Sequence, residues 1–205
     1  MTLGLTFDDG PDPRGTPEVL EALDAVGVNA TFFVLGERVE GHRELCERVR
    51  AAGHEVEVHG YEHLRHPEVS RAAVEADIDR ALEVIGGARR WRIPWGHLAD
   101  FTQEVADQRG LAIVGWSTDT HDWRGDRAEV MLEGLELMNG GIVLAHDGIS
   151  VGAQRTTAAE TARLVPLLVE AARAAGLAPG PLRPSWPVPI PIGNPGFHPG
   201  VVQPA

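Results

Sequence analysis

The sequence predicts an α/β fold in which parallel strands alternate with helices. Strand-like and helix-like segments follow one another up to about residue 175, and most of the strand segments are continuously apolar. Such strands are typical of a parallel sheet that helices cover on its faces. An open doubly wound sheet and a closed or nearly closed β/α barrel both satisfy this pattern. In either case the chemistry belongs at the carboxyl ends of the strands.

The first elements are marked by their composition. Residues 3–7 form a short apolar strand. Thr16 and Pro17 suit the N-cap and the first turn of a helix over residues 16–26. The β-branched and aromatic side chains of residues 30–35 favour a second strand. The chain therefore opens with a strand, a helix and a strand.

The middle of the chain continues this alternation. Apolar side chains at helical spacing predict a helix over residues 42–52, and polar–apolar alternation predicts a strand over residues 55–59. A long helix is expected over residues 67–85 and a fourth strand over residues 89–93. A short helix over residues 100–108 follows. These elements bring the chain to a glycine turn before the fifth strand.

The last elements are two apolar strands, two helices and a tail. Strands are expected over residues 111–116 and 141–145, and helices over residues 127–138 and 157–175. Nine of the fifteen prolines then fall in residues 179–205, a density that argues against regular helix or sheet. We therefore expect one domain over residues 1–178 and a proline-rich C-terminal tail over residues 179–205, which is either disordered or wrapped in extended form along the domain surface.

Composition excludes several classes of function. The net charge of -12 argues against nucleic acid or an anionic membrane as a partner. The one cysteine, Cys46, excludes an intrachain disulfide and a cysteine-rich metal cluster. No apolar run reaches membrane-spanning length, and no signal peptide is visible at the N-terminus. The chain as given is expected to be cytoplasmic, or secreted if a leader has been removed.

Two adjacent carboxylates end the first strand. Asp8 and Asp9 are followed at once by Gly10 and Pro11. Neighbouring side chains of a regular strand point to opposite faces, so a bend is needed for both acids to address one site. Gly10 and Pro11 are expected to supply that bend.

A His-x-x-x-His pair, His59 and His63, follows the third strand. On a helical turn two such residues share a face, which suits two imidazoles on one metal ion. With one aspartate from the first strand they make a three-ligand set that leaves positions open for water and substrate, as catalytic metal sites do. His66, close by, is expected to be a surface residue.

Other strands also end in polar side chains. Arg92 follows the fourth strand and suits a charge-assisted hydrogen bond to an acidic catalytic group. His146 ends the sixth strand and suits a general acid whose charge a carboxylate stabilises. Each set alone is also typical of an ordinary turn, but polar sets after five different strands are hard to assign to chance.

Together these residues resemble the five motifs of the NodB-homology polysaccharide deacetylases, the family-four carbohydrate esterases. The motifs occur in family order as Thr6-Phe7-Asp8-Asp9-Gly10-Pro11, His59 with His63, Arg92-Ile93-Pro94-Trp95-Gly96, Asp119 with Asp122-Trp123, and Leu144 with His146-Asp147. The resemblance implies a distorted β/α barrel. It also implies metal-dependent removal of acetyl groups from N-acetylated oligosaccharides or polysaccharides of the chitin or peptidoglycan type.

The resemblance also implies a role for each motif residue. Metal ligands would be Asp9, His59 and His63, with zinc first among the metals and cobalt, nickel or manganese as alternatives. The implied catalytic residues are Asp8 as base, Arg92 holding that base, the Trp95 backbone N–H as oxyanion donor, His146 as acid and Asp122 orienting His146. Trp123 and Leu144 would form the pocket for the acetyl methyl group.

Some residues depart from the family pattern, and other functions remain in competition. Gly60 stands where the family commonly has Ser or Thr, next to the metal ligands. The same site acting on a non-carbohydrate amide or a cyclic C–N bond is one alternative. A catalytically silent carbohydrate-binding domain is another, but such a domain needs no base and acid together. The presence of Asp8, Arg92 and His146 argues against it.

Overall fold

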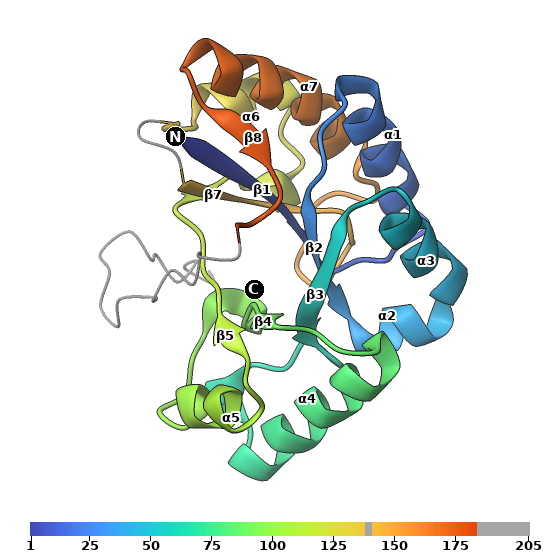
Figure 1. Cartoon of the computed structure of the whole chain (residues 1–205), viewed down its shortest axis with the longest axis vertical. Helices are drawn as coiled ribbons and strands as arrows, with labels where there is room; N and C mark the ends of the chain where they lie inside the picture. Colours follow the sequence, from blue (N-terminus) through green and yellow to red (C-terminus); the bar gives the residue numbers. More distant parts are fainter. Residues whose placement is uncertain (138–140, 184–205) are drawn as a thin grey trace.

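A computed structural model of the 205-residue chain describes residues 1–137 and 141–183. Its strands form one eight-stranded, parallel sheet that curls into a half-barrel with the helices on its outer side (Figure 1). The strand order is β5-β4-β3-β2-β1-β7-β6, and β8 pairs with β1 beside this path. The predicted fold class, a distorted barrel of parallel strands with outer helices, is confirmed.

The strands are β1 (Thr2–Asp8), β2 (Thr31–Leu35), β3 (Glu55–Gly60), β4 (Arg90–Trp91), β5 (Ala112–Ile113), β6 (Thr118–Asp119), β7 (Gly141–His146) and β8 (Ala178–Gly180). The α-helices are α1 (Thr16–Val26), α2 (Gly36–Gly41), α3 (Arg43–Ala51), α4 (Arg71–Ile85), α5 (Thr102–Gln108), α6 (Ala128–Glu133) and α7 (Ala159–Ala174). Short 3-10 turns lie at η1 (His66–Glu68), η2 (Pro94–Gly96) and η3 (Asp122–Arg124).

Most of these elements match the expected ones to within a few residues. The sequence did not indicate α2, a six-residue helix with glycine at both ends, or the two-residue strand β6. The helix expected over residues 127–138 ends at Glu133, and residues 138–140 lie outside the described part of the chain. Thr16 is not the N-cap of α1, which is Gly15; its hydroxyl instead donates to the Asp147 carboxylate.

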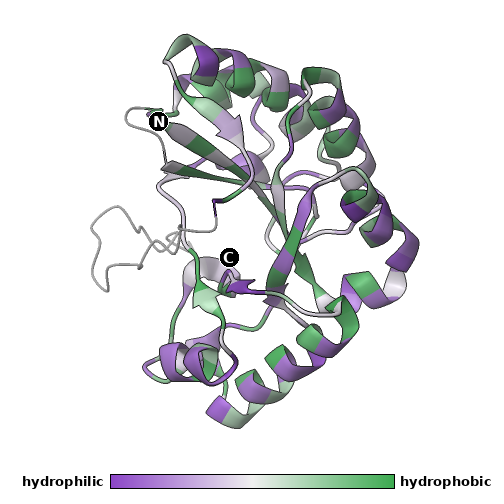
Figure 2. Cartoon of the chain, viewed as in Figure 1, coloured by the Kyte–Doolittle hydropathy of each residue, from purple (hydrophilic) through white to green (hydrophobic). Residues whose placement is uncertain are grey.

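The two faces of the half-barrel have different contents. The outer face carries large apolar side chains that pack under the helices, as Phe7, Phe32 and Trp91 do. Figure 2 shows the polar residues gathered on the outer surfaces of those helices. The inner face carries a small apolar cluster at its base and, above it, buried polar side chains such as Asp8 and Arg92. The polar chemistry of the fold is therefore inside the curl.

The expectation that regular structure ends before Pro179 was wrong. The strand β8 pairs with the first half of β1, with Pro179 opposite Leu3. Proline is accommodated because β8 pairs on one side only, and the missing N–H falls on the unpaired side. Leu182 then enters the inner apolar cluster, and its N–H donates to Thr31 Oγ1 at 3.0 Å. The packed structure thus runs past residue 178, and the remainder of the predicted tail, residues 184–205, lies outside the described residues.

Helices long and apolar enough to cross a bilayer are absent from the described ranges, 1–137 and 141–183.

Candidate active site

The predicted site residues gather at the carboxyl ends of the strands. Asp8 ends β1, His59 is the last residue but one of β3, and His146 ends β7. Arg92 follows β4 directly and Asp122 follows β6. Because parallel strands end at one edge of the sheet, five distant motifs meet in one place.

Asp9, His59 and His63 bring three metal-ligating atoms together. The Nε2 atoms of His59 and His63 each lie 3.4 Å from Asp9 Oδ1. The ligating atoms of the three residues all lie within 4.8 Å of one another. His59 is buried, and the side chain of His63 is 15% exposed, so the set is reachable from one side.

The backbone at these ligands is unusual. Asp9 itself has a φ of 73°, so the bend that turns its carboxylate to the site lies at Asp9, one residue before Gly10. The sequence suggested that the histidine pair lies on a helical turn, but it does not. His59 is the extra residue of a β-bulge, since Val58 pairs with Val34 and Gly60 with Leu35. Such bulges often re-aim a side chain next to an active site.

Left-handed backbone recurs around the site. The non-glycine residues with positive φ in the described chain are Asp9 (73°), His63 (58°), Trp95 (61°) and His121 (52°). All of them lie in the loops that carry the motifs. Residues in such conformations persist only where their surroundings hold them, and they concentrate at functional sites.

The donor set fits a divalent metal ion. Asp9 Oδ1 is buried and has no hydrogen-bond partner, which is costly unless a cation faces it. His59 Nδ1 lies 2.7 Å from the Arg92 carbonyl oxygen, which can only accept, so Nδ1 carries the proton and Nε2 offers its lone pair. Burial lowers the pKa of His63 to about 3, which leaves it neutral. Burial opposes the charge of Asp9, but the surrounding histidines, with the charged His146 among them, hold its pKa well below the ordinary value.

Arg92 holds Asp8 in place. The Arg92 side chain is fully buried, and its Nη1 donates to Asp8 Oδ1 at 2.8 Å and to Thr6 Oγ1 at 2.7 Å. Nη2 donates to the Gly115 carbonyl at 3.0 Å, and the guanidinium lies 4.2 Å above the centre of the Phe33 ring. With Nη1 bound to Asp8 Oδ1, the other carboxylate oxygen, Oδ2, is left facing the His59 ring at 3.8 Å.

His146 and Asp122 form a second polar pair across the site. His146 Nδ1 lies 2.7 Å from Asp122 Oδ1, and the His146 backbone N–H donates to Asp122 Oδ2 at 3.0 Å. Burial opposes the positive charge, but the Asp122 carboxylate outweighs it and raises the pKa of His146 to about 10. Burial likewise opposes the charge of Asp122, yet the imidazolium lowers the pKa of Asp122 to about 2. The pair is therefore an imidazolium and a carboxylate at neutral pH.

Two residues that sequence reasoning missed complete this pair. Thr161 of α7 donates its hydroxyl to Asp122 Oδ2 at 2.6 Å. Arg155 Nη2 lies 3.3 Å from the same oxygen and donates to the His146 carbonyl at 2.8 Å. Neither residue lies in a motif at a strand end, so only their three-dimensional placement reveals them.

Three further predicted site residues lie in different elements. Trp95 lies in η2 with its ring 4.8 Å from that of His63, and its indole N–H donates to the His63 carbonyl at 3.2 Å. Among the hydrogen bonds of residues 1–137 and 141–183, none takes up the Trp95 backbone N–H. Trp123 is half-buried in η3, and Leu144 is buried on β7, two residues before His146.

His66 is not the surface residue that was expected. Its ring is buried against Trp91, with 5.1 Å between the ring centres, and its Nδ1 lies 3.0 Å from Thr102 Oγ1. Burial lowers the pKa of His66 to about 4, so it is a neutral core residue. It does not join the three-ligand set.

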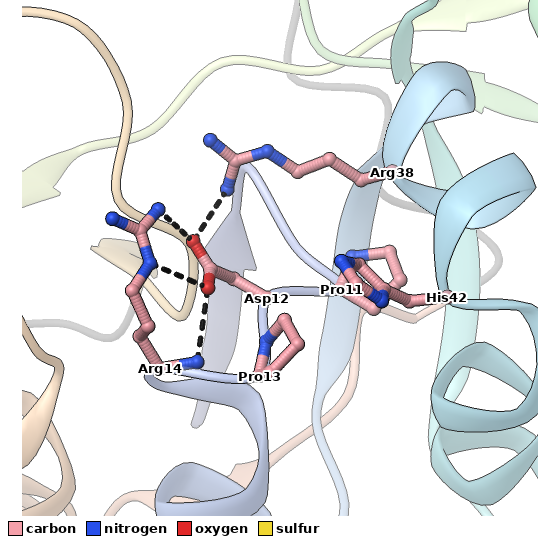
Figure 3. Close-up of a pocket in the computed structure, with 6 residues that line it drawn as sticks. All are labelled: Pro11, Asp12, Pro13, Arg14, Arg38 and His42. Carbon is pink, nitrogen blue, oxygen red and sulfur yellow. Dashed lines mark hydrogen bonds and ion pairs between the residues drawn. The ribbon is translucent and has the colours of Figure 1, made fainter.

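A cavity of about 320 Å³ lies beside the first motif rather than on the acid and base (Figure 3). It is lined by Pro11, Asp12, Pro13, Arg14, Arg38 and His42. Asp12 accepts from Arg14 Nη2 at 2.7 Å and from Arg38 Nη1 at 3.1 Å. Burial opposes the charge of Asp12, but the Arg14 hydrogen bonds lower its pKa to about 2. One wall of this cavity is thus an ion-pair cluster of Asp12, Arg14 and Arg38.

Known proteins share this arrangement. A model of the polysaccharide deacetylase family matches residues 1–114. The chitooligosaccharide deacetylase of Bradyrhizobium sp. is 37% identical to this chain over 170 residues. The match covers 78% of this chain and 76% of that protein. The chain is 34% identical over 177 residues to a peptidoglycan-N-acetylglucosamine deacetylase of Bacillus cereus, with 81% of each covered.

Solved structures agree with the sequence relatives. The family 4 carbohydrate esterase from Streptomyces lividans in complex with acetate is similar with a TM-score of 0.80 and 28% identity, over 91% of this chain and 95% of that one. The fold is thus that of the family-four carbohydrate esterases, a class of carbohydrate deacetylases. The chain belongs to the polysaccharide deacetylase family. The predicted family and class of enzyme are confirmed.

Proposed function

We propose that this chain is a metal-dependent N-deacetylase of N-acetylated sugars, with a chitooligosaccharide or a peptidoglycan-type glycan as substrate. The observation that carries the proposal is the convergence of three sets in one site. They are the ligating atoms of Asp9, His59 and His63, the Asp8–Arg92 pair and the His146–Asp122 pair. The names of the relatives, chitooligosaccharide and peptidoglycan-N-acetylglucosamine deacetylases, supply the substrate class.

Asp9, His59 and His63 would hold the metal, for which zinc is the first choice and cobalt, nickel and manganese are alternatives. A divalent metal at such a set supplies an electrophile for the acetyl carbonyl and acidifies the attacking water. Asp8 is assigned as the general base that takes the proton of that water. Arg92 binds its Oδ1 and leaves Oδ2 to accept the proton, so base and guanidinium act as one unit.

The remaining steps need a hydrogen-bond donor that stabilises the developing negative charge on the acetyl oxygen, and a proton for the leaving nitrogen. The Trp95 backbone N–H is assigned to the oxyanion, a contact whose loss typically costs about 3–4 kcal/mol of transition-state stabilisation. His146 is assigned as the general acid. Its Nδ1 is bound to Asp122, so Nε2 carries the proton that the leaving amine takes up. The C–N bond breaks, and acetate and a free amine are the products.

Trp123 and Leu144 are assigned to the acetyl methyl group. Leu144 lies on β7 two residues before His146, and Trp123 directly follows Asp122. Both are therefore neighbours in sequence of the acid pair. An apolar wall at this place would favour acetyl and disfavour longer or charged acyl groups.

The experiment that tests this proposal is acetate release from N-acetylglucosamine oligomers, with mass spectrometry of the sugar product. The expected result is a product that is lighter by one acetyl group per turnover and carries a free amine. Metal-binding protein that releases no acetate from chitin-type or peptidoglycan-type oligomers would overturn the assigned substrate. That outcome would favour a non-carbohydrate amide.

A further inference from the structure

The loop that carries the second histidine ligand is held in an unusual conformation. Gly60 ends β3 with a φ of 113°, and His63 has a φ of 58°. The four-residue segment 60–63, which ends at the second imidazole, therefore contains two left-handed residues and belongs to no helix. Such a segment keeps its shape only when contacts from outside the loop hold it.

Asp77 of α4 makes those contacts. Its Oδ2 accepts from the Tyr61 backbone N–H at 2.8 Å, and its Oδ1 accepts from the Glu62 backbone N–H at 2.8 Å. Two successive amides thus point at one carboxylate, as they do in anion-binding turns. The Glu62 amide directly precedes His63, so the carboxylate acts one peptide away from a ligand.

The side chain of Tyr61 is anchored separately. Its hydroxyl donates to Glu40 Oε2 at 2.6 Å, and the Arg80 guanidinium lies 3.8 Å from the centre of its ring. These contacts hold Tyr61 to the neighbouring helices α2 and α4. They leave the Glu62 amide to Asp77 alone among the hydrogen bonds of the described residues.

Gly60 leaves room for the Asp77 carboxylate because it has no side chain. A Cβ atom at Gly60 would lie 3.0 Å from Asp77 Oδ2 and 3.5 Å from Pro94 Cγ, and the positive φ is strained for any other residue. Gly60 is the position where the family motif commonly has Ser or Thr. In this chain the Asp77 carboxylate occupies the space beside it.

We propose that Asp77 is a positioning residue for the metal centre, which holds the His59–His63 loop in ligating geometry, and that Gly60 is the residue its carboxylate requires. The inference rests on the proposed function in one respect, since it takes His59 and His63 as metal ligands. It assigns to Asp77 no contact with substrate and no proton transfer.

The test is the zinc affinity of metal-stripped protein, measured by competition with a chromophoric chelator. The variants are Asp77→Ala and Asp77→Asn, and the matched control is Asp79→Ala on the same helix. Asp79 carries the same charge but binds Arg109 at 2.6 Å on the exposed side. Asp77→Ala is expected to bind zinc about 10–100-fold more weakly, the usual effect of losing a partner behind a metal ligand. Asp79→Ala is expected to bind as the unchanged protein does.

Hydrogen exchange gives a second readout. The amides of Tyr61 and Glu62 should lose protection in Asp77→Ala and keep it in Asp79→Ala. If Asp77→Ala does not fold, Asp77→Asn decides, because its amide oxygen can still accept one of the two N–H groups. A weakened zinc affinity of that variant supports the inference.

The outcomes separate the two proposals. An Asp77 variant that folds and binds zinc as tightly as the unchanged protein overturns the inference, even if its melting temperature falls, and leaves the proposed function standing. An unchanged protein that binds no divalent metal overturns the proposed function and the inference with it.

Discussion

The Asp8 carboxylate and the Arg92 guanidinium are joined by a 2.8 Å hydrogen bond inside the curled sheet, where Asp8 is 2% exposed and Arg92 is completely buried. A buried charge is costly unless a partner of opposite charge faces it. The pair therefore links stability to function in this fold. Removal of the arginine should harm folding, and a neutral substitute for the aspartate should remove the base and also cost stability.

Replacing the base tests the chemistry. Asp8→Asn keeps the shape and the three metal ligands but removes the proton acceptor. We expect the protein to bind metal normally and kcat to fall by roughly 10²–10⁴-fold, the usual contribution of a general base. Acetate release and metal content measured on the same preparation check this. Near-full activity of the variant would show that Asp8 is not the base.

Replacing its partner tests the stability. Arg92→Met leaves Asp8 buried without a counter-charge, and the free energy of unfolding should fall by about 3–5 kcal/mol. The control is Arg109→Met, which removes a pair with the 60%-exposed Asp79 and should cost about 0–1 kcal/mol. Urea unfolding of the two variants gives both values. Equal losses would contradict the role given to burial.

The acid pair predicts a pH dependence. In metal-free protein the pKa of His146 is about 10, against 6.5 for an ordinary histidine, because the Asp122 carboxylate outweighs the effect of burial. A pKa raised by folding contributes stability that is fully present below pH 6.5 and is lost as the pH rises through about 10. Asp122→Asn should bring the pKa of His146 down by several units and remove that dependence.

Proton NMR of the His146 ring, with unfolding measured between pH 6 and pH 10, checks this prediction. His54 offers a control in the same spectra, since burial lowers its pKa and Asp122 is not among the causes. A His146 resonance that titrates at the same pH in both proteins would contradict the pairing.

The segment after the C-terminal strand β8 predicts a stability effect at the base of the inner face. Leu182 is 1% exposed in the inner cluster with Phe33, Val114 and Ile142. Leu182→Ala should lower the free energy of unfolding by about 2–5 kcal/mol, because it leaves a cavity. Val151→Ala, at a residue that is 87% exposed, should change it by less than about 0.5 kcal/mol. If Leu182→Ala leaves the free energy of unfolding unchanged, this segment does not pack against the inner cluster in solution.

Strand ends are the part of this fold that sequence predicts best. Apolar runs locate β1 and β7, and polar–apolar alternation locates β3. Because parallel strands end at a common edge, the sequence itself predicts that Asp8, His59 and His146 lie close together. The bend was assigned to Gly10 and Pro11 because both are typical turn residues, but in the folded chain the positive φ lies at Asp9.

Local sequence patterns could not predict contacts between elements that are distant in sequence. Arg155 and Thr161 reach Asp122 from a loop and from α7, with no periodicity or spacing that relates them to it. The proline-rich composition after residue 178 predicted no regular sheet, but β8 forms because it pairs on one side only, where proline is tolerated. In each case tertiary packing decided what composition could not.

The central claim is that the Asp9, His59 and His63 set holds one metal that the reaction needs. The most direct test adds zinc or cobalt in steps to metal-stripped protein and follows acetate release from N-acetylglucosamine oligomers. The account predicts a rate near zero without metal, a rise with each addition and saturation at about one metal per chain, as expected for one three-ligand site. A rate that does not depend on added metal would contradict it.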